Sequence, residues 1–279
     1  MKLKVTRRKF LRALCAGALG TAAYSRWCEP QWLQVGRHRA AINPDAPELR
    51  ILHLSDFHAS RVVSLKEIDE AVTLGLGLKP DLVCLTGDFI TSKYGHFGEY
   101  AKILKRLSDA APAFACLGNH DGGSWAKRWG YSDMNKVETL VSDAGVALLR
   151  NASTAITVND RRLKLVGVGD LWARDLDAAK AFRSVEKSSR ETIVLLSHNP
   201  DSKSEMQDCP WDLMLCGHTH GGQLWIPLIG APFAPVRDKR FVKGLRRWRD
   251  RWIYVTKGIG NVHGVRLNCP PEVSLLTLA

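Results

Sequence analysis

The sequence lacks the features that mark several classes of protein. It contains no internal repeat and no low-complexity tract, and its 23 glycines and 12 prolines are too few for a collagen-like or mucin-like chain. Because 45% of its residues are hydrophobic, it does not have the composition of a disordered chain either. Its 279 residues are enough to bury a complete core, so we expect one large globular domain.

The sequence also lacks the cysteine pattern of a disulfide-bonded protein. The chain has seven cysteines, an odd number that leaves at least one of them unpaired. Cys84, Cys116 and Cys216 lie in short apolar runs, where a thiol serves as a small buried apolar side chain. The other four lack the spacing of a structural zinc site. We therefore expect neither a disulfide framework nor a structural zinc ion.

Acidic residues are scarce in two segments only. The formal net charge of +12 suggests a nucleic-acid partner at first sight. However, residues 1–12 hold six basic groups and no acid, and residues 237–251 hold eight basic groups against Asp238 and Asp250. The remainder of the chain is formally neutral, so nucleic acid is a disfavoured partner.

The amino terminus has the composition of an export signal or a membrane anchor. Residues 1–12 precede Ala13–Tyr24, an uncharged run of small and apolar residues that is too short for a helix crossing a bilayer, which takes ~20 residues. The order Thr6-Arg7-Arg8-Lys9-Phe10-Leu11-Arg12 resembles a bacterial twin-arginine signal, an address for the export of folded proteins. We expect residues 1–28 to form this signal, which implies the periplasmic side of the inner membrane. The alternative is a basic surface anchor on the cytoplasmic face.

The remaining chain has the pattern of an α/β protein. We expect residues 29–48 to form a linker and residues 49–279 to form the folded domain, because short apolar runs alternate with helical patterns from Leu49 onward. Strands are predicted at Leu49–Leu54, Leu82–Leu85, Ala113–Leu117, Leu163–Val168, Thr192–Leu196, Leu213–Cys216, Trp252–Thr256 and Val273–Leu278, with a hairpin around Asn159-Asp160. Helices are predicted at Leu65–Leu78, Glu99–Leu107, Met134–Ala144 and around Asp175–Arg183.

Five of the predicted strands end in residues that can bind metal ions. The carboxyl ends of strands in an α/β sheet form the crevice in which ligands bind. Each polar residue alone is a weak signal, but the ordered set is not, and glycines beside three of the groups permit a close approach of the backbone. The set comprises Asp56 and His58, then Asp88, then Asn119, His120 and Asp121, then His198, and finally His218 and His220.

These residue types suit a pair of divalent metal ions. Two ions ~3.5–4 Å apart clamp a phosphate oxygen and lower the pKa of a bridging water. A bridging carboxylate holds the two ions together, and imidazoles with an amide carbonyl complete about seven ligands of mixed nitrogen and oxygen type. Mn, Fe, Zn, Co and Mg are the candidate ions.

The ordered motifs resemble those of the calcineurin-like metallophosphoesterases over about residues 49–279. They are Asp56-x-His58, Gly87-Asp88, Gly118-Asn119-His120-Asp121, His198 and Gly217-His218-Thr219-His220. The resemblance implies a four-layer α/β/β/α sandwich with a dinuclear metal centre. In that centre Asp56, His58 and His220 would bind one ion, Asp88 would bridge, and Asn119, His198 and His218 would bind the other. His120 would stabilise charge on the phosphate or protonate the leaving oxygen, and Asp121 would orient the His120 ring.

Longer matching segments resemble the bacterial YaeI-type phosphodiesterases, a branch that includes membrane-associated relatives of the UDP-2,3-diacylglucosamine hydrolases of lipid A synthesis. The segments are residues 114–121, 198–203, 210–224, 231–236 and 266–269. The resemblance implies a phosphodiesterase or pyrophosphatase that uses metal-bound hydroxide, with a lipid-linked substrate as a hypothesis. The alternatives are a nuclease, a cyclic-nucleotide phosphodiesterase, and a non-catalytic assembly module on the same fold.

The second basic segment interleaves cations and indoles in Arg246–Trp252. One interpretation is an exposed hairpin tip whose charges are merely solvated. A second is a contact with an anionic membrane surface, where tryptophan and basic residues both bind well. A third is stacking of single-stranded nucleic acid on Trp248 and Trp252. The sequence leaves these open.

Overall fold

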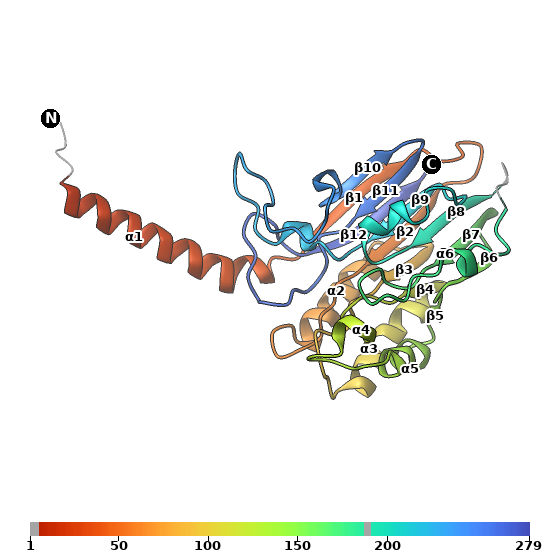
Figure 1. The fold of residues 1–279 in the computed structure, drawn as a ribbon, viewed down its shortest axis with the longest axis horizontal. Helices are drawn as coiled ribbons and strands as arrows, with labels where there is room; N and C mark the ends of the chain where they lie inside the picture. The colour runs from red at the N-terminus through yellow and green to blue at the C-terminus, as the bar shows by residue number, and fades with distance from the viewer. Residues whose placement is uncertain (1–5, 187–190) are drawn as a thin grey trace.

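Two six-stranded sheets pack face to face in the computed structural model, which describes residues 6–186 and 191–279 (Figure 1). The basic residues Lys2 and Lys4 lie outside the described residues. Side chains alternate between the two faces of the strands, as period-2 geometry requires. In the strand that ends before the His218 motif, Leu213 and Leu215 face the other sheet, whereas Met214 and Cys216 belong to the outer cluster. The sandwich architecture expected from the sequence is confirmed.

The first sheet contains the strands that deliver the first three polar groups. Its spatial order is β1 (Gln34–Ala40), β12 (Glu272–Leu278), β2 (Leu49–Leu54), β3 (Leu82–Thr86), β4 (Ala113–Cys116) and β5 (Ala147–Leu148). Strands β2 to β5 are parallel, β12 is antiparallel to β2, and β1 runs parallel to β12. The expected linker at residues 29–48 is therefore wrong in part, because β1 lies inside it and joins the sheet along its full length.

The second sheet delivers the last two polar groups. Its order is β10 (Gly244–Trp248), β11 (Arg251–Val255), β9 (Leu213–Cys216), β8 (Thr192–Leu196), β7 (Arg161–Gly167) and β6 (Ala152–Val158). The predicted hairpin is confirmed as β6–β7, and both of its turn residues, Asn159 and Asp160, have the positive φ that a two-residue turn needs.

Helices cover the outer face of the first sheet. They are α2 (Leu65–Gly77), α3 (Phe97–Ala110) and α5 (Asn135–Asp143), with the single turn α4 (Gly123–Ala126) beside them. Helix α2 begins at Ser64, whose hydroxyl and the Glu67 carboxylate form a reciprocal capping box. The helix expected around Asp175–Arg183 is only one turn, α6 (Ala178–Ala181), because Phe182 and Val185 both turn into the core after it.

The amino-terminal helix α1 (Arg7–Ala23) projects from the body, and none of its residues is buried (Figure 1). Among the residues that the structure describes, no helix combines the length and the apolar character needed to span a membrane. Tyr24–Cys28 and Glu29–Gln31 continue α1 as short helical turns. The Glu29 carboxylate is buried and accepts hydrogen bonds from the backbone N–H groups of Asn268 and Cys269. The expected boundary at residue 28 therefore falls within a segment that is attached to the body.

Candidate metal centre

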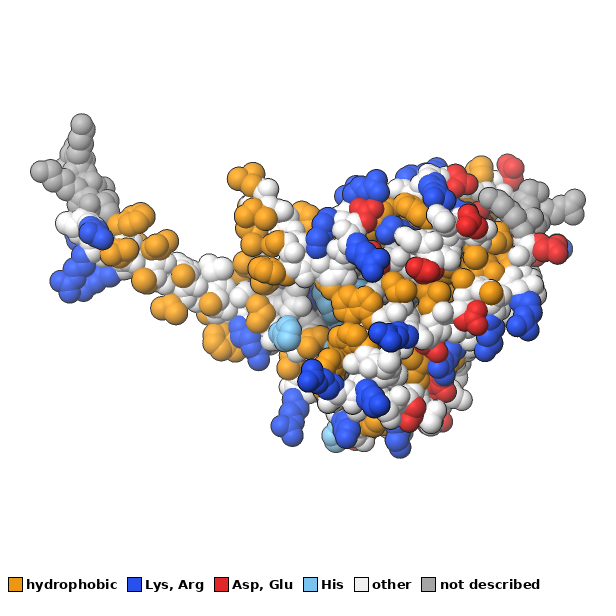
Figure 2. All heavy atoms as spheres, in the orientation of Figure 1, with side chains coloured by type: hydrophobic (Ala, Val, Ile, Leu, Met, Phe, Trp, Pro, Cys, Tyr) orange, Lys and Arg blue, Asp and Glu red, His pale blue; other side chains and the backbone are white. Residues whose placement is uncertain are grey.

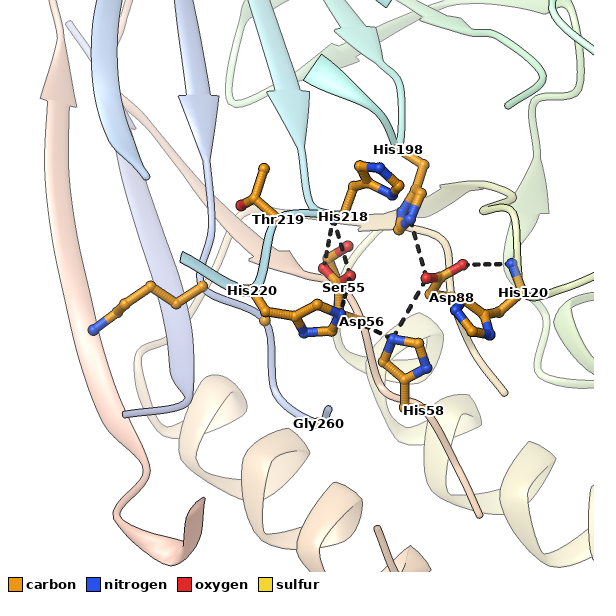
Figure 3. Close-up of polar contacts among 12 residues, drawn as sticks. Ser55, Asp56, His58, Asp88, His120, His198, His218, Thr219, His220 and Gly260 are labelled. Atoms are coloured by element: carbon orange, nitrogen blue, oxygen red, sulfur yellow. Dashed lines mark hydrogen bonds and ion pairs between the residues drawn. The ribbon is translucent and has the colours of Figure 1, made fainter. Parts of the chain in front are cut away.

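The polar residues at the five strand ends converge on one site (Figure 3). Strands of the first sheet end in Asp56, His58, Asp88, Asn119 and His120, and strands of the second end in His198, His218 and His220. Both sheets contribute because their carboxyl ends lie at the same edge of the sandwich. The structure thus brings together residues that are up to 164 positions apart, from Asp56 to His220.

The backbone at the site adopts an unusual conformation. Five of the seven predicted ligands have φ between 51° and 70°, the left-handed region that only a few per cent of non-glycine residues occupy. They are Asp56, His58, Asp88, His218 and His220. Each such residue costs about 1–3 kcal/mol and persists only where its surroundings hold it, which is typical of functional sites.

Two glycines allow the strand ends to approach one another. A Cβ atom at Gly118 would lie 2.2 Å from Oδ1 of Asp88, and one at Gly217 would lie 2.2 Å from Oδ2 of Asp56. Neither position has room for any side chain. The glycines beside the motifs therefore do what the sequence predicts, since they let carboxylates from one loop lie against the backbone of the next.

The donor atoms of the site lie within coordination range of shared positions. Oδ2 of Asp88 is 3.4 Å from Nε2 of His58 and 3.1 Å from Nε2 of His198, and Nε2 of His220 is 3.5 Å from Oδ1 of Asp56. Nε2 of His58 and Nε2 of His220 are 3.2 Å apart. Three sets have donor atoms within 4.8 Å of one another: Asp56, His58 and His220; Asp56, Asp88 and His198; and His58, Asp88 and His120.

Several buried donor atoms in the described part of the chain have no hydrogen-bond partner. At the site they include Oδ1 of Asn119, Nε2 of His218 and Nε2 of His198, which has only the Asp88 carboxylate beside it at 3.1 Å. Buried polar atoms are nearly always satisfied, so these atoms gathered at one site indicate a missing ligand. Nδ1 of His198 lies 2.6 Å from the carbonyl oxygen of Thr86, which fixes the ring and leaves Nε2 as the coordinating nitrogen. These residues fit a pair of divalent cations.

Burial keeps most of the imidazoles in the neutral form that binds metal. It lowers the pKa of His58 and His218 well below the usual range, and it lowers the pKa of His220 to about 3. Burial acts to raise the pKa of Asp88 and to lower that of His198, but the attraction between the two groups outweighs it. The pKa of Asp88 is held well below its ordinary value and that of His198 well above. Asp88 is therefore ionised at neutral pH, as a bridging carboxylate must be.

The structure corrects the role expected for Asp121. Its carboxylate does not orient the His120 ring but accepts hydrogen bonds from the backbone N–H groups of Asp88, Phe89 and Gly118, at 2.9, 2.7 and 2.8 Å. It thereby ties the loop after β3 to the loop after β4. The His120 ring is held instead by the carbonyl oxygen of Thr91, which is 2.7 Å from Nδ1.

A cavity of about 470 Å³ opens beside the metal-binding residues. His120 packs edge-on against Trp125, and His218 packs edge-on against Trp172, with ring centroids 4.4 and 4.3 Å apart. Sequence reasoning missed both tryptophans. The signal for Trp172 was present, because it follows the end of β7 in the same way that the predicted ligands follow theirs, and the buried Asp170 carboxylate holds its loop by accepting from the Trp172 N–H.

The tryptophans of the second basic segment are engaged in packing. Trp248 stacks on the buried Trp211 with ring centroids 5.7 Å apart, and Trp252 is covered by the Arg247 guanidinium at 4.3 Å. Both belong to the partly buried margin of the core. The interpretation as a hairpin with a solvated charged face is favoured, because Trp211 and Arg249 pack on Trp248 and Arg247 packs on Trp252.

Comparisons with known proteins agree with this geometry. Residues 49–222 match the model of the calcineurin-like phosphoesterase family. Phosphodiesterase YaeI of Escherichia coli is 43% identical over 278 residues, which cover 98% of this chain and 99% of that protein. UDP-2,3-diacylglucosamine pyrophosphatase LpxG of Chlamydia trachomatis is 26% identical over 323 residues, with 95% of each chain covered. A 5'-nucleotidase precursor from Thermus thermophilus shares the fold with a TM-score of 0.50 and 12% identity, over 83% of this chain and 54% of its own.

Proposed function

This chain belongs to the calcineurin-like phosphoesterases, and from that premise we propose that it hydrolyses the phosphodiester or pyrophosphate bond of a lipid-linked substrate such as UDP-2,3-diacylglucosamine. The family hydrolyses phosphoesters at a dinuclear centre of divalent ions. One relative is a phosphodiesterase, and another is a pyrophosphatase whose substrate carries two acyl chains. Both relatives support the proposal over nearly the full length of the chain.

We assign the predicted ligands to two ions. Asp56, His58 and His220 would hold one ion, in agreement with their common set of donor atoms. Asn119, His198 and His218, whose buried donor atoms lack a hydrogen-bond partner, would hold the other. Asp88 would bridge, because its Oδ2 lies within 3.4 Å of an imidazole from each set. The bound ions supply positive charge to the phosphoryl oxygens and lower the pKa of the attacking water.

His120 is placed to act on the leaving group. The Thr91 carbonyl accepts from Nδ1, which leaves Nε2 as the ring nitrogen available to the cavity that His120 lines. The His120 backbone N–H also donates to Oδ1 of Asp88 at 2.9 Å, so its position is tied to the bridging carboxylate. With both ring nitrogens protonated, Nε2–H would stabilise charge on the phosphate or donate its proton to the departing oxygen, while Nδ1–H stays bonded to Thr91.

The residues that line the cavity support a lipid-linked substrate. Apart from the metal-binding residues, most of the side chains that line the cavity are apolar, although Gln223 and His263 also line it. The apolar ones include Trp125, Trp172, Leu224, Phe233, Val262 and Val265. No lysine or arginine lines the cavity among the residues that the structure describes. A nuclease would need cationic groups along the path of the phosphate backbone, so this lining disfavours that alternative. A complete ligand set disfavours a non-catalytic assembly module.

A substrate panel on the metal-reconstituted protein tests the proposal. The panel contains UDP-2,3-diacylglucosamine, a second lipid pyrophosphate, a cyclic nucleotide, single-stranded DNA and a water-soluble bis-aryl phosphate. We expect hydrolysis of the bis-aryl phosphate and faster hydrolysis of a lipid-linked substrate than of the nucleotide or the DNA. Asp88→Asn and His120→Ala serve as controls, and hydrolysis at the parental rate by either would contradict the assigned site. Preference for DNA or a cyclic nucleotide would refute the lipid-linked substrate.

A further inference from the structure

A loop between the last ligand motif and β10 exposes large apolar side chains at its tip. Ile226 and Gly230 close the loop with two main-chain hydrogen bonds of 2.8 Å, so the tip at residues 227–229 is held in place. Leu228 is fully exposed, and 68% of Ile229 is exposed. These side chains therefore stand in solvent on a defined support, where they contribute nothing to the core.

The backbone at Leu228 is unfavourable for a leucine. Its φ of 68° lies in the left-handed region, where glycine or asparagine is expected and another residue costs about 1–2 kcal/mol. An exposed leucine in this conformation weakens the loop and gains no packing. The folding of the chain does not explain this leucine, which points to a contact between its side chain and an external surface.

Helix α1 presents a second unpartnered set of apolar side chains. Phe10, Leu11, Leu14 and Leu19 are exposed along it, and the base of the helix adds exposed Trp27 and Trp32. An isolated helix of 17 residues is marginal in water without a surface to pack against. Tryptophan at such a position is typical of a membrane–water interface.

Main-chain hydrogen bonds connect the loop to the base of α1. The Arg266 N–H donates to the Ser25 carbonyl at 2.9 Å, and the next residue, Leu267, exchanges hydrogen bonds of 3.0 and 2.8 Å with Gln223 and Trp225. The two apolar features are therefore held together by the strand-like segment at 266–267. In Figure 2 the orange side chains of the loop and of α1 project from the same side of the molecule.

The positive charge on the side of the molecule formed by the loop and α1 favours an anionic partner. The segments that form it, residues 6–32, 218–237 and 257–271, contain one acidic residue, Glu29, which is buried, whereas acidic side chains are visible on the body in Figure 2. Each Lys or Arg near an anionic leaflet contributes about 1 kcal/mol of attraction, and α1 begins with Arg7, Arg8, Lys9 and Arg12. A second copy of the chain would bring these like charges together, which disfavours a symmetric dimer through the same surface.

We propose that Leu228, Ile229 and the apolar side chains of α1 insert into an anionic lipid leaflet. Phe233 follows the loop, is 72% exposed and also lines the cavity, so docking would bring the mouth of the cavity to the lipid surface. The docking surface goes beyond the proposed activity. Only the delivery of an amphipathic substrate from the leaflet to the cavity rests on that activity.

Vesicle flotation of the full chain tests the docking surface. Vesicles of phosphatidylcholine alone are compared with vesicles that also contain phosphatidylglycerol, and the parent is compared with a Leu228→Asn, Ile229→Ser variant. Asparagine tolerates the left-handed backbone, so the variant keeps its fold, and neither residue lines the cavity. We expect the parent to prefer the anionic vesicles and the variant to bind them at least tenfold more weakly. An Arg246→Ala, Arg249→Ala variant of the β10–β11 hairpin serves as the control and should bind like the parent.

The outcomes separate this proposal from the proposed activity. Equal binding by the parent and the loop variant would overturn the docking surface, and so would a parent that forms dimers, binds no vesicles and becomes monomeric on loop substitution. The loop variant should hydrolyse the soluble bis-aryl phosphate at the parental rate. A parent that binds anionic vesicles through the loop but hydrolyses no phosphoester would support docking and contradict the proposed activity.

Discussion

At the scale of single residues, the site is built from positions that a stable fold would otherwise avoid. The ligand-bearing loops use left-handed backbone at five non-glycine residues and place glycine where two loops touch. Buried donor atoms without partners add to this cost. A structure that maintains so many unfavourable local choices at one place is organised around a bound group, and metal binding offsets the cost.

Gly217 should be indispensable for metal affinity. A Cβ atom there would lie 2.0 Å from Oγ of Ser55 and 2.2 Å from Oδ2 of Asp56, so Gly217→Ala displaces the Asp56 carboxylate. We expect metal affinity, measured by calorimetric titration of the apoprotein, to fall by about 10–100-fold. Gly98→Ala is the matched control, because Gly98 lies in α3 where a Cβ atom would meet no neighbour within 4 Å, and its affinity should be unchanged. Parental affinity in both variants would show that the contact does not position Asp56.

His53 should make the stability of the protein depend on pH. The side chain is fully buried, and burial lowers its pKa to about 3. Between pH 6.5 and about 3 the unfolded chain binds the proton and the folded chain does not, so the free energy of unfolding decreases as the pH falls through this window. The His53→Gln variant keeps a partner for Thr86 but does not titrate. Urea unfolding should show that the variant loses up to about 3 kcal/mol less than the parent between about pH 7 and about pH 4. Parallel losses in the two proteins would exclude His53 as the source.

At the scale of secondary-structure elements, prediction from the sequence succeeded where the apolar pattern is strong. The buried strands β8 and β9 have the predicted bounds, since continuous apolar runs of this length are typical of central strands. Strand β2 also has the predicted bounds, although Arg50 and His53 interrupt its apolar run. Strand β1 was missed because residues 34–40 carry Arg37, His38 and Arg39 and only join the sheet through pairing with β12, which is distant in sequence. The length of helix α6 was overestimated, because Phe182 and Val185 fit a helical pattern but pack into the core after the helix has ended.

The same limit applies to the site. The candidate ligands were predictable because they follow strands in order. Figure 3 shows six of them together, and the seventh, Asn119, lines the same cavity. The role of Asp121 was not predictable, because its partners are backbone N–H groups from two different loops. A motif of side chains does not indicate such partners. The two tryptophans of the cavity were likewise invisible to a search for metal-binding residues.

Glu29 should stabilise one wall of the cavity. Its carboxylate accepts from the backbone N–H groups of Asn268 and Cys269, in the same loop as the cavity-lining Val265. Glu29→Ala leaves two donors unsatisfied, so we expect a loss of about 1–3 kcal/mol in the free energy of unfolding and faster hydrogen exchange at residues 264–269. Glu29→Gln retains an acceptor oxygen, so it should lose less of the free energy of unfolding than Glu29→Ala and show slower hydrogen exchange at residues 264–269. Glu48→Gln, at an exposed ion pair with Arg39, should change neither.

At the scale of the whole molecule, the excess positive charge lies in two separate segments, residues 1–12 and 237–251, of an otherwise neutral chain. The hairpin at β10–β11 uses its cations to cover indoles, whereas the cations of α1 stand free on an exposed helix. The net charge of +12 therefore does not describe one surface.

Replacement of both Arg7 and Arg8 by lysine distinguishes export from anchoring. We propose that the pair is read as a twin-arginine signal, whose recognition depends on arginine itself and not on charge. The variant should then disappear from the periplasmic fraction of a bacterial host and accumulate in the cytoplasm, measured by immunoblot of fractionated cells. Arg246→Lys with Arg247→Lys is the matched control and should fractionate like the parent. An unchanged distribution of the Arg7, Arg8 variant would favour the surface anchor on the cytoplasmic face.

The pairing of β1 with β12 couples the two ends of the chain. Strand β1 finds its partner only at residues 272–278, and Glu29 finds its partners at residues 268 and 269. The base of α1 is thus held by residues 266–278, so the direction of the amino-terminal helix depends on the folding of this later part of the chain.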